Sequence, residues 1–344
     1  MKIVTVVGAR PQFIKAWPVS IALSEDGVTE CVIHTGQHYD PSMSDIFFDE
    51  FGMRKPNYML DQGGGSHGKM TGRMLEAVEK VLFKEEPDAV LVYGDTNSTL
   101  AGALAAVKIH IPVIHVEAGL RSRNFAMPEE QNRILTDHIS SLLLCPTTES
   151  VKNLAAEGIR DKVHHIGDVM YDATLKAVEA VKEYSDIVQR LALEDIDYTV
   201  MTVHRAENTN TKEQLVDILN WVTDSVGSRQ IILPAHPRIQ SMLEDMSSIP
   251  TSIKIIDPLG YIDMAALMMN CFDVYTDSGG LQKEAYFHGK RCTTLRSETE
   301  WSETIRTGWN RLAGEEYACD PIQIFEYGEG DASRKVVRYL TQLM

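Results

Sequence analysis

Short apolar runs alternate with longer amphipathic stretches along the whole chain. Most of the runs are apolar throughout, as expected for strands that are buried on both faces of a sheet. The stretches between them show helical spacing, and one apolar stripe covers Leu215, Ile218, Leu219 and Val222. This alternation predicts βαβ units and therefore an α/β fold with parallel sheets. The expected strands cover 2–7, 30–34, 89–93, 112–116, 142–145, 198–203, 230–234, 253–256, 274–276 and 292–295.

Ten strands are too many for one ordinary open sheet, so we expect two sheets of about five strands, one in each half. A length of 344 residues agrees with two domains. The boundary is expected near Gly167 and Asp168, where a strand-like segment at 163–166 ends, and a polar stretch precedes a last helix. We therefore expect one Rossmann-like domain at 1–167 plus 332–344 and a second at 168–331.

Composition and charge narrow the range of partners. The chain has 33 Lys and Arg against 49 Asp and Glu, and the net charge of −16 disfavours a nucleic-acid partner but allows a small anionic substrate. The five cysteines form no C-x-x-C pair, which argues for a reducing compartment and against a zinc module. No apolar run approaches the ~20 residues of a membrane helix, and the run at 3–7 is too short for a signal peptide. We expect a soluble cytoplasmic protein without a membrane partner.

Polar or glycine-rich loops follow six of the expected strands at the same end. Ordinary loop chemistry, with glycine for turns and Asp or Ser for helix caps, explains one or two such loops. Six loops that carry acids, imidazoles and guanidinium groups predict instead a ligand cleft between two facing sheets. The loops begin at Gly8, Gly94, Glu117, His204, Ala235 and Asp277.

Two nucleotide-binding motifs are absent from the sequence. A dinucleotide fold needs G-x-G-x-x-G after the first strand, whereas this chain has only Gly8, followed by Arg10 and Pro11. A G-x-x-x-x-G-K-[ST] motif is absent as well, which excludes P-loop chemistry. Arg10 and Lys15 can contact an anion from this position, although both could equally be solvated surface charges.

The segment Asp277–Gly280 follows an expected strand and precedes an expected helix. Backbone N–H groups at Gly279 and Gly280, the helix dipole and the Ser278 hydroxyl would form an anion cradle. Ser278 could also be a plain helix N-cap. Glu284 could bind the two hydroxyls of a ribose, or it could simply compensate the helix dipole.

Acids and imidazoles on other loops are candidates for proton transfer. Asp95 and Glu117 follow separate strands and can converge, whereas the pair after Pro128 could merely complement a helix dipole. His204 and His236 could be catalytic, core or surface histidines. The spacing of His34, His38, His115 and Glu117 fits no zinc motif, so we reject a metal site there.

Several of these segments together carry a family resemblance. The chain resembles the non-hydrolysing UDP-N-acetylglucosamine 2-epimerases of bacteria over nearly its whole length. Each segment alone is moderately specific, but their joint order is highly specific. The segments are Gly8-Ala9-Arg10-Pro11 with Lys15, Thr35-Gly36-Gln37-His38, Gly94-Asp95-Thr96, 115–121, 128–133, His204-Arg205-x-Glu207, Pro234-x-His236 and 276–284.

The resemblance implies a glycosyltransferase-B-like architecture of two Rossmann-like domains with parallel sheets facing across a cleft. It also implies a homodimer, a UDP-sugar substrate, no cofactor, no metal and a place in polysaccharide biosynthesis. The family's catalytic acids correspond to Asp95, Glu117 and Glu129, and its catalytic histidine to His204. The residues implied to hold the UDP-sugar are Arg10, Lys15, Arg133, His236, Ser278, Gly279, Gly280 and Glu284.

The implied reaction interconverts UDP-GlcNAc and UDP-ManNAc by anti elimination of UDP to a 2-acetamidoglucal and re-addition. The short segment between Leu120 and Pro128 looks more like a subgroup acting on UDP-2,3-diacetamido-2,3-dideoxyglucuronic acid, which is a second candidate substrate. The sequence also allows a hydrolysing epimerase, a glycosyltransferase of the same fold or a catalytically silent UDP-sugar sensor. Some family members bind a second, activating UDP-sugar near residues that correspond to Gln37, His38 and Arg73.

Overall fold

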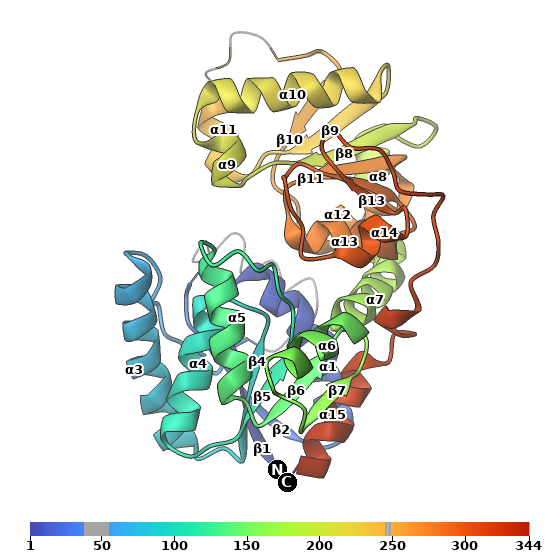
Figure 1. Ribbon diagram of the computed structural model, residues 1–344. Coiled ribbons are helices and arrows are strands. Elements are labelled where there is room, and N and C mark those ends of the chain that lie inside the picture. Colours follow the sequence, from blue (N-terminus) through green and yellow to red (C-terminus); the bar gives the residue numbers. More distant parts are fainter. Residues whose placement is uncertain (38–54, 245, 247–248, 344) are drawn as a thin grey trace. The chain divides into compact units, whose positions relative to one another are not determined.

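The computed structural model describes residues 1–37, 55–244, 246 and 249–343, which form two compact units (Figure 1). Unit 1 comprises Met1–Leu175 and Phe325–Met344, and unit 2 comprises Lys176–Ile324. These limits differ from the expected boundaries at 167 and 331. The Asp168 N–H donates to the Tyr327 carbonyl oxygen at 3.0 Å, and this bond ties both connecting segments to unit 1.

Unit 1 is built on a seven-stranded sheet with the strand order β3-β2-β1-β4-β5-β6-β7, and every neighbouring pair is parallel. Its strands are β1 (Lys2–Val7), β2 (Thr29–His34), β3 (Tyr58–Met59), β4 (Ala89–Tyr93), β5 (Val113–Val116), β6 (Leu142–Cys145) and β7 (Val163–His165). Its helices are α1 (Arg10–Glu25), α3 (His67–Glu85), α4 (Asn97–Lys108), α5 (Pro128–Ile139), α6 (Thr148–Ala156), α7 (Val169–Tyr184, which continues into unit 2), the 3-10 turn η1 (Phe325–Tyr327) and α15 (Ala332–Leu343).

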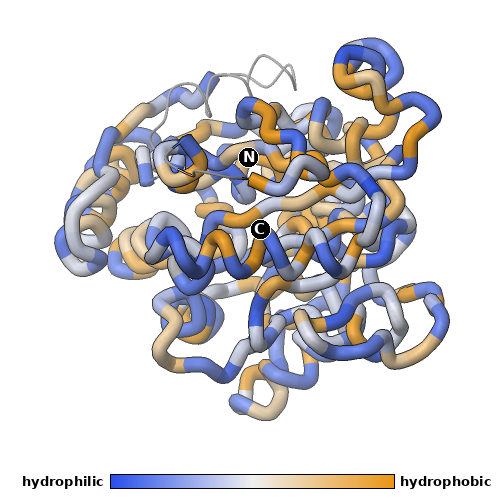
Figure 2. Tube along the Cα trace, turned by 90° about the horizontal axis from the view of Figure 1, so that it is seen from above, coloured by the Kyte–Doolittle hydropathy of each residue, from blue (hydrophilic) through white to orange (hydrophobic). Residues whose placement is uncertain are grey.

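Helices cover both faces of this sheet. Successive side chains of a strand point to opposite faces, so β1 contributes to two cores. Ile3 and Val7 pack with α1 and α15, whereas Val4 and Val6 pack with α3 and α4. Hydrophobic and hydrophilic residues alternate along the helical turns of the trace (Figure 2). Because helices cover both faces of this sheet, ligands can reach it mainly at the ends of its strands. The polar loops that begin at Gly8, Gly94 and Glu117 lie there.

Unit 2 repeats this plan with a six-stranded parallel sheet of order β10-β9-β8-β11-β12-β13. One core includes residues of α8, α12 and α13, and the other includes residues of α10 and α11. Its strands are β8 (Tyr198–Thr202), β9 (Gln230–Pro234), β10 (Ile253–Ile256), β11 (Asp273–Thr276), β12 (Arg291–Thr294) and β13 (Asn310–Leu312). Its helices are α8 (Ile187–Arg190), α9 (Ala206–Thr209), α10 (Lys212–Val226), α11 (Pro237–Glu244), α12 (Tyr261–Asn270), α13 (Gly279–Phe287) and α14 (Ser302–Arg306).

The predicted α/β class with two parallel sheets is confirmed, and all ten expected strands are present within one or two residues of their expected ends. The expectation of about five strands per sheet was too low. It omitted β3 and β13, which have two and three residues, and did not count the strand-like segment that forms β7. Such short strands carry too few residues to show a period.

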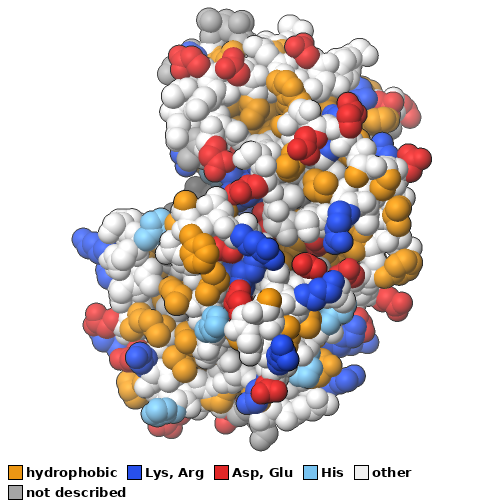
Figure 3. Space-filling view, viewed as in Figure 1, with side chains coloured by type: hydrophobic (Ala, Val, Ile, Leu, Met, Phe, Trp, Pro, Cys, Tyr) orange, Lys and Arg blue, Asp and Glu red, His pale blue; other side chains and the backbone are white. Residues whose placement is uncertain are grey.

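On the face of the molecule drawn in Figure 3, acidic and basic side chains are mixed. The excess of acids is therefore not concentrated there. Across the described ranges, no helix is both long and apolar enough to cross a membrane.

The last helix is fixed to unit 1 by a buried carboxylate. Asp172 on α7 accepts the Ala332 N–H at 3.2 Å, the Ser333 N–H at 2.7 Å and the Ser333 hydroxyl at 2.6 Å. These N–H groups lie in the first turn of α15, where a helix has no internal acceptors for them. Burial raises the pKa of Asp172, while the three hydrogen bonds oppose that rise. One side chain on α7 thus caps a helix that begins far along the chain.

We predict that Asp172→Ala lowers the free energy of unfolding of the full chain by about 1–3 kcal/mol, because two buried N–H groups lose their acceptor. Urea unfolding followed by circular dichroism measures the change. The exposed Asp161 is a matched control, and Asp161→Ala should stay within about 0.5 kcal/mol of the wild type. Equal stabilities of the two variants would show that Asp172 does not hold α15.

Candidate active site

The loop after β1 is closed by a buried glutamine. Gln12 Oε1 accepts the N–H groups of Gly8 and Ala9, and its Nε2 donates to the Tyr93 carbonyl oxygen at 2.9 Å. A Cβ at Gly8 would lie 2.1 Å from hydroxyl oxygens on two neighbouring elements, so only glycine fits there. The loop is therefore tied to the end of β4 and presents Arg10 at the start of α1.

Two of the expected site residues form an ion pair. Lys15 on α1 is buried, and its ammonium group contacts the Glu117 carboxylate directly. A Cβ at Gly94 would lie 3.1 Å from Glu117 Oε2 and 3.3 Å from Lys15 Nζ. The sequence suggested that Lys15 faces an anionic ligand, and the structure gives it an anionic protein partner. The pair lies beside the residue that precedes Asp95.

The backbone of Glu117 is strained. Its φ is +69°, in the left-handed region that non-glycine residues seldom occupy. Its N–H donates to the Leu144 carbonyl oxygen at 3.0 Å, and the next residue, Ala118, donates to the same oxygen. Strain of this kind costs roughly 1–3 kcal/mol and persists where the surroundings enforce it, often at functional sites.

A second ion-pair cluster in the same unit contains the Asp95 carboxylate and a buried arginine. Arg133 Nη2 donates to Asp95 Oδ2 at 2.6 Å, and Arg133 Nη1 donates to Glu130 Oε2 at 2.9 Å. The Asp95 side chain is 29% exposed, so it can still meet a ligand, whereas Arg133 is buried. Asn132 holds the same loop by donating to the Asp95 carbonyl oxygen at 2.9 Å.

Adjacent glutamates at the start of α5 have different surroundings. Glu129 is exposed, whereas Glu130 is buried and accepts the N–H groups of Ser122 and Arg123 at 2.9 and 2.8 Å. Burial raises the pKa of Glu130, but the two N–H donors and Arg133 outweigh it, so the net shift is downward. Glu130 therefore folds the loop before α5, and Glu129 is the member of the pair that is available to a ligand.

Unit 2 places a histidine against a buried carboxylate. Asp277 follows β11, and its Oδ1 lies 3.2 Å from His204 Nδ1. The same carboxylate accepts the Arg205 N–H at 2.8 Å and the Asn208 side-chain amide at 3.0 Å. In the neutral ring, this contact places the proton on Nδ1 and makes Nε2 the basic nitrogen. The His236 ring stacks on His204 with centroids 5.2 Å apart.

The segment after Asp277 forms a capped helix start. Ser278 is the N-cap of α13, and its hydroxyl accepts the Leu281 N–H, as the plain N-cap interpretation expected. Glu284 is buried one turn into the helix, and its Oε1 would lie 3.7 Å from a Cβ at Gly280. A Cβ at Gly279 would lie 2.4 Å from Glu300 Oε1, so a larger residue would require the Glu300 side chain to move. An N-cap and an anion cradle are compatible, because one side chain satisfies only one of the first N–H groups.

The residues that correspond to the activating UDP-sugar site of some family members are described only in part. Gln37 accepts the Ser98 N–H at 2.9 Å, and Arg73 donates to the carbonyl oxygens of Gln62 and Gly63 at 3.0 and 2.8 Å. Both side chains are thus used within the protein. His38 lies outside the described residues.

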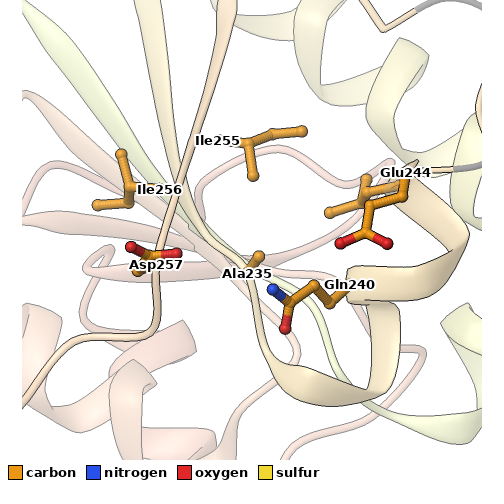
Figure 4. Close-up of a pocket in the computed structure, with 7 residues that line it drawn as sticks. Ala235, Gln240, Glu244, Ile255, Ile256 and Asp257 are labelled. Carbon is orange, nitrogen blue, oxygen red and sulfur yellow. The ribbon is translucent and has the colours of Figure 1, made fainter.

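A pocket of about 330 Å³ lies beyond the ends of β9 and β10 in unit 2 (Figure 4). Gln240 and Glu244 of α11 lie on one side of it, and Ile256 and Asp257 come from the end of β10. None of the expected site residues lines this pocket, although its wall includes Ala235, the neighbour of His236. Within the described part of the chain, no three His, Cys, Asp or Glu side chains are grouped to hold a metal ion.

Sequence reasoning did not assign a role to two buried acids, Asp277 and Asp137. Asp277 could have been found from the strand order. Thr276 pairs with Thr202 at the ends of β11 and β8, so Asp277, the next residue after β11, must lie near the loop that follows β8. Asp137 lies on α5 and contacts His115, and nothing in the spacing of these two residues indicates that contact.

The chain matches a known protein family over most of its length. The family model for UDP-N-acetylglucosamine 2-epimerase matches residues 21–341. A UDP-N-acetylglucosamine 2-epimerase homolog from Methanococcus maripaludis is 48% identical, with 100% of both chains covered. The UDP-2,3-diacetamido-2,3-dideoxy-D-glucuronate 2-epimerase of Pseudomonas aeruginosa is 46% identical, again with 100% of both chains covered.

Solved structures show the same likeness. The crystal structure of Methanocaldococcus jannaschii UDP-GlcNAc 2-epimerase in complex with UDP-GlcNAc and UDP is similar with a TM-score of 0.91 and 40% identity. The match covers 99% of this chain and 100% of that one, which confirms the glycosyltransferase-B-like fold class. Both the family model and full-length relatives at more than 40% identity therefore lead to one conclusion: the chain belongs to the UDP-N-acetylglucosamine 2-epimerase family.

Proposed function

We propose that this protein is a non-hydrolysing UDP-N-acetylglucosamine 2-epimerase that interconverts UDP-GlcNAc and UDP-ManNAc. The observation that carries the proposal is the fixed pair of carboxylates at the loops after β4 and β5, with Asp95 held by Arg133 and Glu117 held by Lys15. Relatives of this chain that are aligned over their full length bear the same activity in their names.

The chemistry explains why several acids are needed. The C2 proton of an N-acetylhexosamine is weakly acidic, so its removal must accompany cleavage of the anomeric C–O bond. The electron pair of the C2–H bond forms the C1=C2 double bond, UDP leaves with the anomeric oxygen, and a 2-acetamidoglucal remains. UDP then adds back to C1 while a proton returns to the opposite face of C2. The reaction needs a base and an acid on different faces of the sugar.

Residues of both units are proposed to act on this substrate. Asp95 or Glu117 exchanges the proton on one face, and Glu129 and His204 serve the other face or the leaving group. Arg10, Lys15, Arg133, His236 and the α13 N-terminus with Ser278, Gly279 and Gly280 hold the diphosphate and stabilise the charge that develops on it. Glu284 binds the ribose. Homodimeric assembly, a cytoplasmic location, the absence of a cofactor and a role in polysaccharide biosynthesis stay predictions.

A 2-epimerase of UDP-2,3-diacetamido-2,3-dideoxyglucuronic acid is the second candidate. Its support is the 46% identity to the Pseudomonas aeruginosa enzyme of that name, together with the short loop before α5. That loop is folded by Glu130 and places the exposed Arg123 at a φ of +60°. A cation there would suit an acidic sugar better than a neutral one.

Incubation with UDP-GlcNAc in D₂O, without added NAD, tests the proposal. We expect UDP-ManNAc to form and both nucleotide sugars to gain deuterium at C2, as seen by proton NMR. Free N-acetylmannosamine with UDP would instead show hydrolysis. Unchanged UDP-GlcNAc, beside conversion of the diacetamido uronate nucleotide in a parallel sample, would establish the second candidate.

Removing either fixed carboxylate should stop the proton transfer. We predict that Asp95→Asn and Glu117→Gln each lower turnover about 10²–10⁴-fold, the usual contribution of a positioned general base. UDP affinity, measured by calorimetry, should change little. Wild-type turnover in one variant would remove that residue from the mechanism.

The two neighbouring glutamates of α5 should behave differently. Glu129→Gln is predicted to lower turnover while the free energy of unfolding stays within about 0.5 kcal/mol of the wild type. Glu130→Gln is predicted to lower that free energy by about 1–3 kcal/mol, because a buried charged acceptor is lost. Since folding lowers the pKa of Glu130, its stabilisation exists above the unfolded-state pKa and is lost as the pH falls through the folded-state value. The reverse pattern in the two variants would exchange their assigned roles.

A further inference from the structure

His115 is fully buried on β5 and has so far been given no role. Its Nδ1 lies 2.7 Å from Asp137 Oδ1, and its Nε2 lies 2.7 Å from the Gly94 carbonyl oxygen. A backbone carbonyl oxygen can only accept, so Nε2 must carry a hydrogen. If the Asp137 carboxyl is ionised, it also can only accept, and Nδ1 must carry a hydrogen as well.

The surroundings of Asp137 favour its ionised form. Its Oδ2 accepts the Gly119 N–H at 3.1 Å and Arg121 Nη1 at 2.7 Å, so this oxygen faces only donors. Burial raises the pKa of Asp137, but the charges of His115 and Arg121 outweigh it and the net shift is downward. From this geometry we propose that His115, together with Asp137, is a positioning residue for the loops that carry the carboxylates Asp95 and Glu117.

The buried carboxylate of Asp137 is paired with a cation. His115 and Arg121 face Asp137, and Arg121 also donates to both oxygens of Glu157 at 2.6 and 2.8 Å. Asp137 and Glu157 therefore share Arg121, and the buried carboxylate of Asp137 has a cationic partner. The other titratable groups nearby are His138, whose Nε2 lies 3.3 Å from Glu157 Oε2, the thiol of Cys145, whose pKa is raised by burial, and the Lys15–Glu117 pair on the far side of Gly94.

The contacts of this group explain what it positions. His115 holds the carbonyl oxygen of Gly94, the residue directly before Asp95. Asp137 holds the N–H of Gly119, two residues after Glu117. Gly94 has a φ of +63°, which favours glycine, and a side chain there would crowd Glu117. One ion pair therefore fixes the two loops that carry the proposed acid and base, and its effect on the reaction rests on the proposed function.

Nitrogen-15 NMR of the histidine-labelled full chain tests the hydrogen bond from His115 to Gly94 without reference to activity. We expect Nε2 of His115 to have the chemical shift of a protonated nitrogen, because it faces the Gly94 carbonyl oxygen. The signals are assigned by their loss in His115→Gln. An unprotonated Nε2 would overturn the proposal, whatever reaction the protein catalyses.

Kinetics tests the positioning role. Glutamine at position 115 can donate to Gly94, but its amide oxygen would then face and repel Asp137. We expect His115→Gln to lower kcat about 10–100-fold with KM within about twofold, because misplaced groups weaken general base catalysis more than binding. His138→Gln, on the more exposed histidine of α5, is the matched control and should leave kcat unchanged. Equal kcat in the two variants, in protein of wild-type circular dichroism, would remove the positioning role.

Discussion

The carboxylates of Glu117, Asp95 and Asp277, at strand ends of the two sheets, are each compensated by a cation or by several N–H donors, and the arrangement of the loops depends on this compensation. An unpaired charge in a covered sheet would cost several kcal/mol, so the chain must bring a partner to each acid. Lys15 reaches Glu117 from α1, Arg133 reaches Asp95 from α5, and backbone N–H groups surround Asp277. The acids are therefore held in place before a ligand arrives.

This compensation also links different parts of the chain. The elements that meet around Glu117 and Asp95 begin at widely separated positions, namely α1, the loops after β4 and β5, and α5. Parallel strand order brings these loops to one edge, and the ion pairs then set the distances between their side chains. The strained backbone of Glu117 fits this view, because several surrounding bonds enforce a conformation that the residue alone would avoid.

The sequence predicted the strands and the loops of the site well, since apolar runs and polar strand ends are local signals. It did not predict β3 and β13, which are too short to show a period. It also could not distinguish Glu129 from Glu130, because adjacent positions in a first helical turn look alike until a loop folds over one of them. The partners of His115 and Lys15 were missed for a similar reason: they depend on contacts between distant elements.

The central claim is that the fixed carboxylates act while UDP is detached from the sugar and then returned. Positional isotope exchange tests this directly, with UDP-GlcNAc that carries oxygen-18 in the bond between C1 and the β-phosphorus. The account predicts that the label moves into the non-bridging β-phosphate positions about as fast as C2 exchanges its proton. Epimerisation with the label kept entirely in the bridge would contradict it.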